Sequence, residues 1–138
     1  SPPSASPPPS ASPPSASPSR QATSPPSKTS TSAAPSSYIE LYDFLALGEF
    51  HTCAITNDNK LKCWGNNDNG QLGDGTTANR NIPTTIDLGL NVYAVRVALG
   101  RYHTCAVTND NKLKCWGNND NGQLGDGTTA NRNIPTTI

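Results

Sequence analysis

The residues of this chain best suited to chemistry are four cysteines and two histidines. His51, Cys53 and Cys63 lie close together in the sequence, and the same spacing recurs further along in His103, Cys105 and Cys115. Imidazole and thiolate groups are zinc ligands, whereas two cysteines alone can form a disulfide. A closed structural zinc site needs four ligands, and each group offers three without the usual C-x-x-C spacing. We therefore expect no metal site.

The segments that carry these residues have the pattern of a β-hairpin. Residues 51–56 and 60–64 each alternate between the two faces of a strand. Between them lies Asn-Asp-Asn at 57–59, and both residue types tolerate the left-handed backbone of a three-residue turn. The hairpin is the element that must position the cysteines.

The register of this hairpin brings the cysteines together. Pairing Thr56 with Lys60 places Cys53 opposite Cys63 on one face, at roughly 4.5 to 5.5 Å between Cβ atoms, near the disulfide range. We expect disulfides within each unit, with free thiols as the alternative; the four residues are Cys53, Cys63, Cys105 and Cys115. Paired cysteines with none left over favour an oxidising compartment.

The chain contains an internal repeat. Residues 51–86 recur as residues 103–138, and the two copies differ only at Ile55 and Val107. A period of roughly 50 residues is typical of stacked or radial architectures, in which each unit needs a neighbour to bury its apolar face. We therefore expect that two such units are not the whole assembly.

The second half of each unit is rich in turn-forming residues. Residues 65–81 are dominated by Gly, Asn and Asp, which predicts tight turns. Oxygen-rich loops also suggest calcium, but Gly70 occupies a position where the D-x-[DN]-x-[DN]-G pattern needs an acidic ligand. A further strand is expected from Ile82, with Pro83 near its start.

These motifs resemble a known family. Gly-x-x-His-Thr-Cys-Ala, Cys-Trp-Gly-x-Asn-x-x-Gly-Gln-Leu-Gly-Asp-Gly-Thr-Thr and Arg-x-x-Pro-Thr are similar to the repeat of the regulator of chromosome condensation family over residues 45–138. The resemblance implies a β-propeller, usually of seven four-stranded blades, with mainly architectural His, Trp and Gln-Leu-Gly positions. We expect an all-β fold, here a partial β-propeller of two blade-type repeats, 45–96 and 97–138, the second truncated.

The first 37 residues form a separate region. They contain 11 of the 13 prolines and 14 serines, and nothing apolar larger than alanine or proline. This composition predicts an extended polyproline II-like tail, with the repeat region at 38–138. The tail resembles hydroxyproline-rich glycoproteins, and the alternative is an unmodified linker. The candidate O-glycosylation sites are Ser4, Ser6, Pro7, Pro8, Pro9, Ser10, Ser12, Pro13, Pro14, Ser15, Ser17, Pro18, Pro25 and Pro26.

Composition excludes several functions. The formal net charge is zero, which gives no support to nucleic-acid binding, and no run of 18 apolar residues suggests a membrane span. No catalytic constellation or cofactor motif is present. The turn residues that differ between the copies, Glu49 against Arg101 and Phe50 against Tyr102, are candidate partner contacts.

These observations together favour a structural role. We expect a non-enzymatic extracellular glycoprotein that forms or decorates a cell-surface appendage, wall or fibril. Its partners would be O-linked glycans and further copies or other propeller blades. A secreted recognition module on a Ser/Pro tether is the alternative, followed by a small-GTPase regulator, because family members perform unrelated tasks on one fold.

Overall fold

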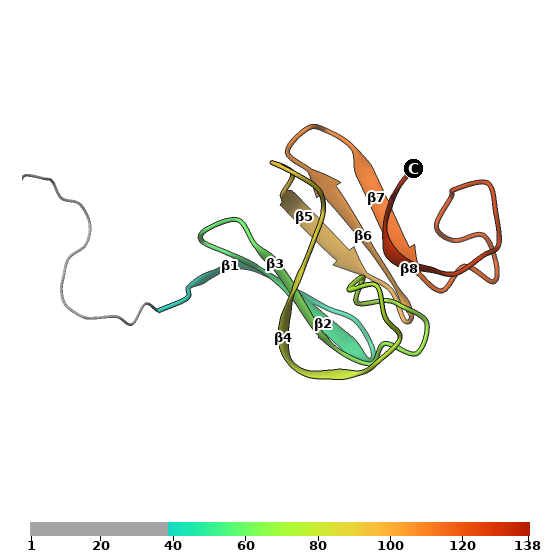
Figure 1. The fold of residues 1–138 in the computed structure, drawn as a ribbon, viewed down its shortest axis with the longest axis horizontal. Coiled ribbons are helices and arrows are strands. Elements are labelled where there is room, and N and C mark those ends of the chain that lie inside the picture. The colour runs from blue at the N-terminus through green and yellow to red at the C-terminus, as the bar shows by residue number, and fades with distance from the viewer. Residues whose placement is uncertain (1–38) are drawn as a thin grey trace, which may run out of the picture. The chain divides into compact units, whose positions relative to one another are not determined.

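Two sheets make up the described part of the chain. The computed structural model describes residues 39–138, in which all regular structure is β-strand. The first sheet contains β1 (Tyr42–Leu47), β2 (His51–Thr56), β3 (Leu61–Gly65) and β4 (Arg80–Ile86), and the second contains β5 (Ala94–Leu99), β6 (His103–Thr108), β7 (Leu113–Gly117) and β8 (Arg132–Thr137). Each sheet is antiparallel, with its strands paired in chain order, and the two sheets lie side by side (Figure 1). The expected all-β fold is confirmed.

The predicted hairpin is present in both sheets. In the first, the Thr56 amide donates to the Lys60 carbonyl over 2.9 Å, and Asn59 adopts a positive φ of 66°. That left-handed residue closes a three-residue turn whose twist suits the flanking strands. The resulting register places Cys53 opposite Cys63, with their Cα atoms 4.1 Å apart and their sulfurs joined. Cys105 and Cys115 repeat this arrangement.

The fourth strand begins earlier than the sequence suggested. β4 starts at Arg80, so Pro83 lies inside the strand. Thr84 pairs with Cys63 and Arg80 with Gly65, which leaves residues 81–83 opposite Trp64 alone. A bulge in an edge strand tolerates proline because no ladder hydrogen bond is required from its nitrogen. The repeat boundaries read from the sequence, 45 and 97, fall within β1 and β5.

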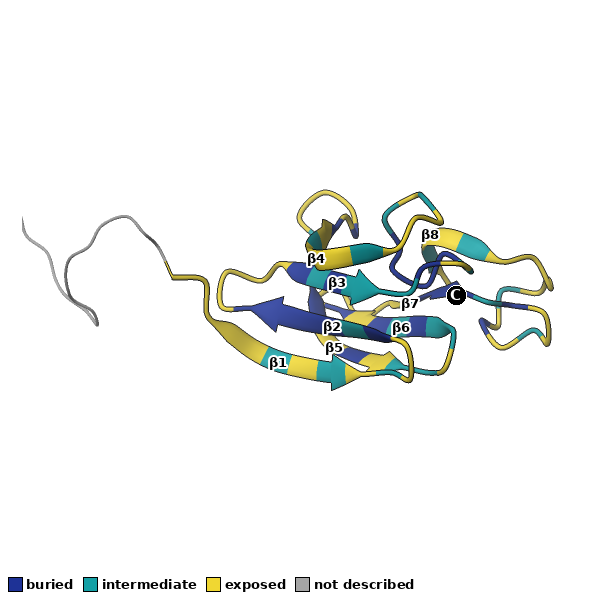
Figure 2. Ribbon diagram, turned by 90° about the horizontal axis from the view of Figure 1, so that it is seen from below, coloured by how far each residue is buried: buried dark blue, intermediate teal, exposed yellow. Residues whose placement is uncertain are grey.

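The apolar core lies between the two sheets. Ile55, Leu61 and Ile86 from the first sheet are buried with Val97 and Trp116 from the second. Figure 2 shows that β2 is almost entirely buried, whereas β1 and β4 at the sheet edges are largely exposed. One face of the first sheet is therefore buried, and the second sheet is what covers it.

The two disulfides should stabilise the oxidised chain. Each bridge closes a loop with a sequence separation of 10. Chain-entropy arguments give about 2.5 to 3 kcal/mol for a loop of this size. Urea unfolding with and without dithiothreitol should show a loss of this order for each bridge, and a variant with all four cysteines replaced by Ser should not respond. Four alkylated cysteines in the unfolded, unreduced protein would contradict the pairing.

The contact between Gly73 and Trp116 offers a second test of the fold. A Cβ at Gly73 would lie 2.6 Å from the indole Nε1, whereas at Gly125, the same position in the second repeat, the nearest atom is 3.5 Å away. The two glycines have matching φ values of +83° and +81°, so backbone strain is the same for both. Gly73→Ala should therefore lower the unfolding free energy by about 1 to 3 kcal/mol more than Gly125→Ala. Equal losses in urea unfolding of dilute protein would contradict this packing.

Candidate functional site

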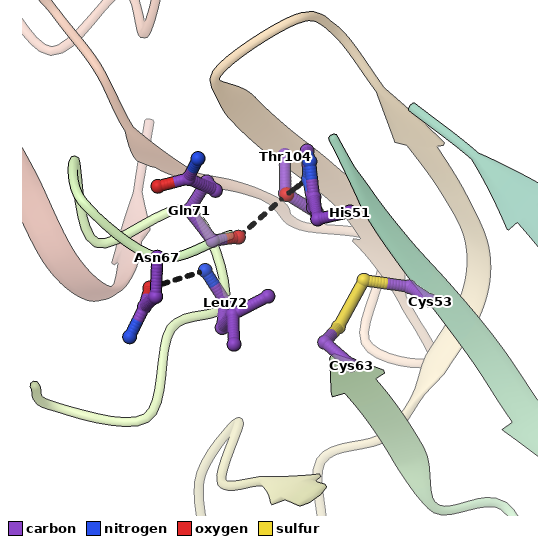
Figure 3. The surroundings of a disulfide bond; sticks show 7 residues. All are labelled: His51, Cys53, Cys63, Asn67, Gln71, Leu72 and Thr104. Atoms are coloured by element: carbon purple, nitrogen blue, oxygen red, sulfur yellow. Dashed lines mark hydrogen bonds between the residues drawn. A yellow bond between two sulfur atoms is a disulfide. The ribbon is translucent and has the colours of Figure 1, made fainter. Parts of the chain in front are cut away.

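A chain of three hydrogen-bonded groups links the two sheets. The His51 Nε2 atom lies 2.7 Å from the Thr104 hydroxyl, which donates to the Gln71 carbonyl over 2.7 Å (Figure 3). We call these three residues the relay. Because the Thr104 proton is directed at Gln71, the hydroxyl accepts from His51, and the imidazole is the neutral tautomer with its proton on Nε2.

The relay is buried, and this sets its protonation. His51 is 3% exposed, and Nδ1 has no hydrogen-bond partner among the described residues. A second proton on Nδ1 would be a buried charge with nothing to accept it. Desolvation, with a smaller repulsion from His103, lowers the pKa of His51 to about 4, while burial also lowers the pKa of His103. Histidine here acts as a structural donor.

Glycine allows the imidazoles to adopt this position. The β1–β2 turn begins at Gly48, where an added Cβ would lie 3.0 Å from the His51 ring, and at Gly100 the distance to the His103 ring would be 2.3 Å. Each imidazole therefore folds back over a backbone without a side chain. The Gly-x-x-His spacing seen in the sequence has this steric cause.

A network of polar side chains holds the β3–β4 loop that carries Gln71. Asn67 is fully buried; its amide nitrogen donates to the carbonyls of Thr76 and Ala78, and its oxygen accepts from the Leu72 amide. Burial alone would raise the pKa of Asp74. Hydrogen bonds from Thr76, Arg80 and Asn67 outweigh burial and hold that pKa below its ordinary value.

This network bears on the calcium alternative. Both Asp74 oxygens already accept hydrogen bonds from protein donors, which include the Arg80 guanidinium at 2.7 Å. The residues that the structure describes contain no group of three or more His, Cys, Asp and Glu side chains placed to hold a metal. His51, Cys53 and Cys63, the potential zinc ligands, are instead committed to the relay and the disulfide.

A second cluster lies where the β1–β2 turn meets the β5–β6 turn. Phe50 stacks on Tyr102 with ring centroids 5.5 Å apart, and the Arg101 guanidinium lies 5.7 Å and 5.2 Å from the two rings. Glu49 pairs with Arg101 over 3.4 Å. We call these four residues the rim patch. The sequence identified them only as positions that differ between the copies; their stacking across 52 positions leaves no local pattern.

The candidate glycosylation positions between Ser4 and Pro26 lie outside the described residues. Among the residues described, no helix is long and apolar enough to cross a membrane.

The relay predicts a dependence of stability on pH. The folded pKa of His51 lies below its ordinary 6.5, so between pH 6.5 and about 4 the unfolded chain binds a proton that the folded chain does not. The free energy of unfolding should fall as pH is lowered through this window, by about 3 kcal/mol at most from His51 alone. Above pH 6.5 the contribution of His51 is fully present. Urea midpoints at pH 7 and 4.5 should move less in His51→Gln than in the wild type. An equal shift in both proteins would contradict the assignment.

Comparisons with known proteins agree with this geometry. The regulator of chromosome condensation (RCC1) repeat matches residues 58–107 and 110–138, and a second description of the same repeat matches 44–71 and 94–123. The Arabidopsis thaliana ultraviolet-B receptor UVR8 is 41% identical over 64% of this chain and 20% of its own length. The Danio rerio protein RCC2 homolog is 42% identical over 64% of this chain and 18% of its own length. The chain thus spans about a fifth of these relatives.

Solved structures show the same architecture. Human WBSCR16 has a TM-score of 0.64 at 25% identity and covers 70% of this chain and 26% of its own. Yeast RCC1 (Prp20) has a TM-score of 0.65 at 21% identity and covers 77% of this chain and 26% of its own. The expected partial propeller is confirmed as a fold.

The expected extracellular or cell-surface location is wrong. Relatives of this repeat are intracellular: RUG3 of Arabidopsis thaliana, 34% identical over 68% of this chain and 21% of its own length, is mitochondrial, and Saccharomyces cerevisiae Prp20p is described by its binding to Gsp1p and histones. The error came from treating paired cysteines as a marker of compartment, whereas hairpin register alone brings the sulfurs together. The wall or fibril glycoprotein interpretation depended on that location. By its matched repeats, this chain belongs to the regulator of chromosome condensation (RCC1) repeat family, and its two sheets are two blades of a β-propeller.

Proposed function

We propose that this chain is a protein-recognition module whose neighbouring blades share one binding surface, the rim patch. One observation carries the proposal. Equivalent turns of two nearly identical repeats place different residues, Glu49 and Phe50 against Arg101 and Tyr102, in a single stacked cluster. The surface is therefore composite, and neither blade contains it alone.

The chemistry of the rim patch suits a protein ligand. The Arg101 side chain is 62% exposed while its guanidinium lies over two aromatic rings, and Phe50 is also exposed. Tyrosine and arginine are enriched among the few residues that dominate binding energy at protein interfaces, and a stacked arginine loses little freedom when bound. We assign the patch a segment that carries a carboxylate to displace Glu49 and an apolar side chain to cover Phe50.

Binding rather than catalysis fits the remaining polar residues. In the β3–β4 loop, hydrogen bonds occupy the side chains of Asn67 and Asp74. In the β7–β8 loop of the second blade, they occupy those of Asn119 and Asp126 in the same way. Such groups shape turns and are not free to transfer protons. The Ser/Pro-rich residues 1–37 serve in this proposal as a tether, on their composition alone.

A peptide-display experiment tests the rim patch. A random phage-displayed library is selected on the immobilised full chain, and binding of the enriched peptides is measured to the wild type, Arg101→Glu and Lys112→Glu. Lys112 is a matched control because it is an exposed cation at the opposite end of the strands, in the β6–β7 turn. Loss of the Arg101 contacts should weaken binding at least about tenfold, corresponding to a charged hydrogen bond, and Lys112→Glu should have no such effect.

Two results would overturn the proposal. One is a selection that enriches no carboxylate-containing sequence. The other is a set of peptides whose affinity is the same for Arg101→Glu and for the wild type. Circular dichroism and alkylation of the unreduced variants would show that each retains its sheets and disulfides.

A further inference from the structure

Each blade has one face that its neighbour in the chain does not cover. The front face, on the first blade, carries Leu45, Thr52 and Trp64; the back face, on the second blade, carries His103, Val107, Leu113 and Gln123. Leu113 is 41% exposed, but its equivalent Leu61, which faces the second blade, is 2% exposed. Similarly, Gln123 is exposed whereas Gln71 is fully buried. The same residues are buried wherever a following blade is present.

We propose that the back face of one copy of this chain binds the front face of a second copy, so that chains associate head to tail. This inference is independent of the rim patch. Its occupant is fixed by continuity with the junction inside the chain, because the surfaces that meet there are repeated on the two free faces. A contact between different faces adds a subunit without using up the ends.

The polar part of the junction is reproduced in full. Inside the chain, His51 and Gln71 of one blade engage Thr104 of the next. On the free faces the equivalent residues are His103, Gln123 and Thr52. Docking would let the His103 imidazole donate to the Thr52 hydroxyl of a second copy, and that hydroxyl donate to the Gln123 carbonyl. The half-buried His103 and Thr52 would then reach the environment of their equivalents.

The aromatic part of the junction is reproduced as well. Trp116 is fully buried against Gly73, whose missing Cβ leaves room for the indole. Trp64, its equivalent on the front face, is only half-buried, and Gly125, the equivalent of Gly73, has no side chain or backbone atom closer than 3.5 Å to its Cβ position. The indole and its seat are therefore both present on free faces.

The apolar residues that differ between the blades change in compensating directions. The internal core contains Ile55 and Val97, whereas the free faces carry Val107 and Leu45 at the same positions. One methylene group is lost on the back face and one is gained on the front face. Volume-conserving exchanges of this kind are the best tolerated in packed interfaces.

A second pair of facing positions differs in both size and charge. Phe44 and Ala94 in the internal junction are replaced on the free faces by Arg96 and Tyr42. Tyr42 is larger than Ala94, so the front face gains volume at this position, and on the back face Arg96 replaces Phe44, where a cation can meet an aromatic ring. Within the chain the Arg96 guanidinium already lies 6.0 Å from the Phe44 ring.

The mass of the full chain in solution tests the proposal. Sedimentation velocity and light scattering over a range of concentrations should show species that grow in steps of one 14.5 kDa chain. Leu113→Glu on the back face, or Leu45→Glu on the front face, should abolish this growth. Leu90→Glu is the matched control, because Leu90 is 91% exposed in the connection between the blades and belongs to neither face.

Mixing the two blocked variants tests the head-to-tail arrangement itself. Leu113→Glu retains an intact front face and Leu45→Glu an intact back face, so an equimolar mixture should form a dimer while each alone stays monomeric. Thr52→Val offers a milder variant that cannot disturb folding through a lost hydrogen bond, since its hydroxyl has no partner in the described chain. It should weaken association by about tenfold.

Four outcomes would overturn the proposal. The wild type would stay monomeric at every concentration, or Leu113→Glu alone would dimerise through two front faces, or the mixture would remain monomeric. Association that is lost in Arg101→Glu but not in Leu113→Glu would assign self-association to the rim patch and equally exclude the back face.

Discussion

The structure depends on a polar link that is buried between the two sheets and held by hydrogen bonds. His51, Thr104 and the Gln71 carbonyl come from two different repeats, and each lies in surroundings where an unpaired polar group would be costly. The link holds the sheets at one angle and spacing, because none of its members can move without leaving another unpaired. The apolar core supplies most of the attraction between the sheets, and the relay supplies geometry.

The two repeats show how much of a residue's environment comes from its neighbours. Trp64 and Trp116 have the same local sequence and the same strand position, yet one is half-buried and the other fully buried. Disulfide chemistry follows the same division. Cys53 and Cys63 are sealed beneath the second blade, whereas Cys105 remains half-buried on the uncovered side. Since exchange with an external thiol requires access to sulfur, the first bridge is shielded from reductants by packing.

Sequence reasoning succeeded where the controlling interactions are local. The alternating pattern and the Asn-Asp-Asn turn fix the hairpin register within a few residues of Cys53, so the cysteine pairing could be read directly. The relay could not be predicted, because His51 and Thr104 meet only after both sheets have formed. Pro83 was misplaced because the bulge that accommodates it depends on pairing with β3. Intracellular relatives corrected a location that composition alone had suggested.

The near identity of the repeats also sets a problem for the folding chain. Strand β2 of one repeat has almost the same residues as β6 of the other, so a nascent hairpin carries little information about which sheet it should join. The first strands differ, with YDFLAL in β1 and AVRVAL in β5. These two strands distinguish one sheet from the other, because a short turn ties each of them to its own hairpin. The difference disfavours the exchange of strands between the tandem copies during synthesis.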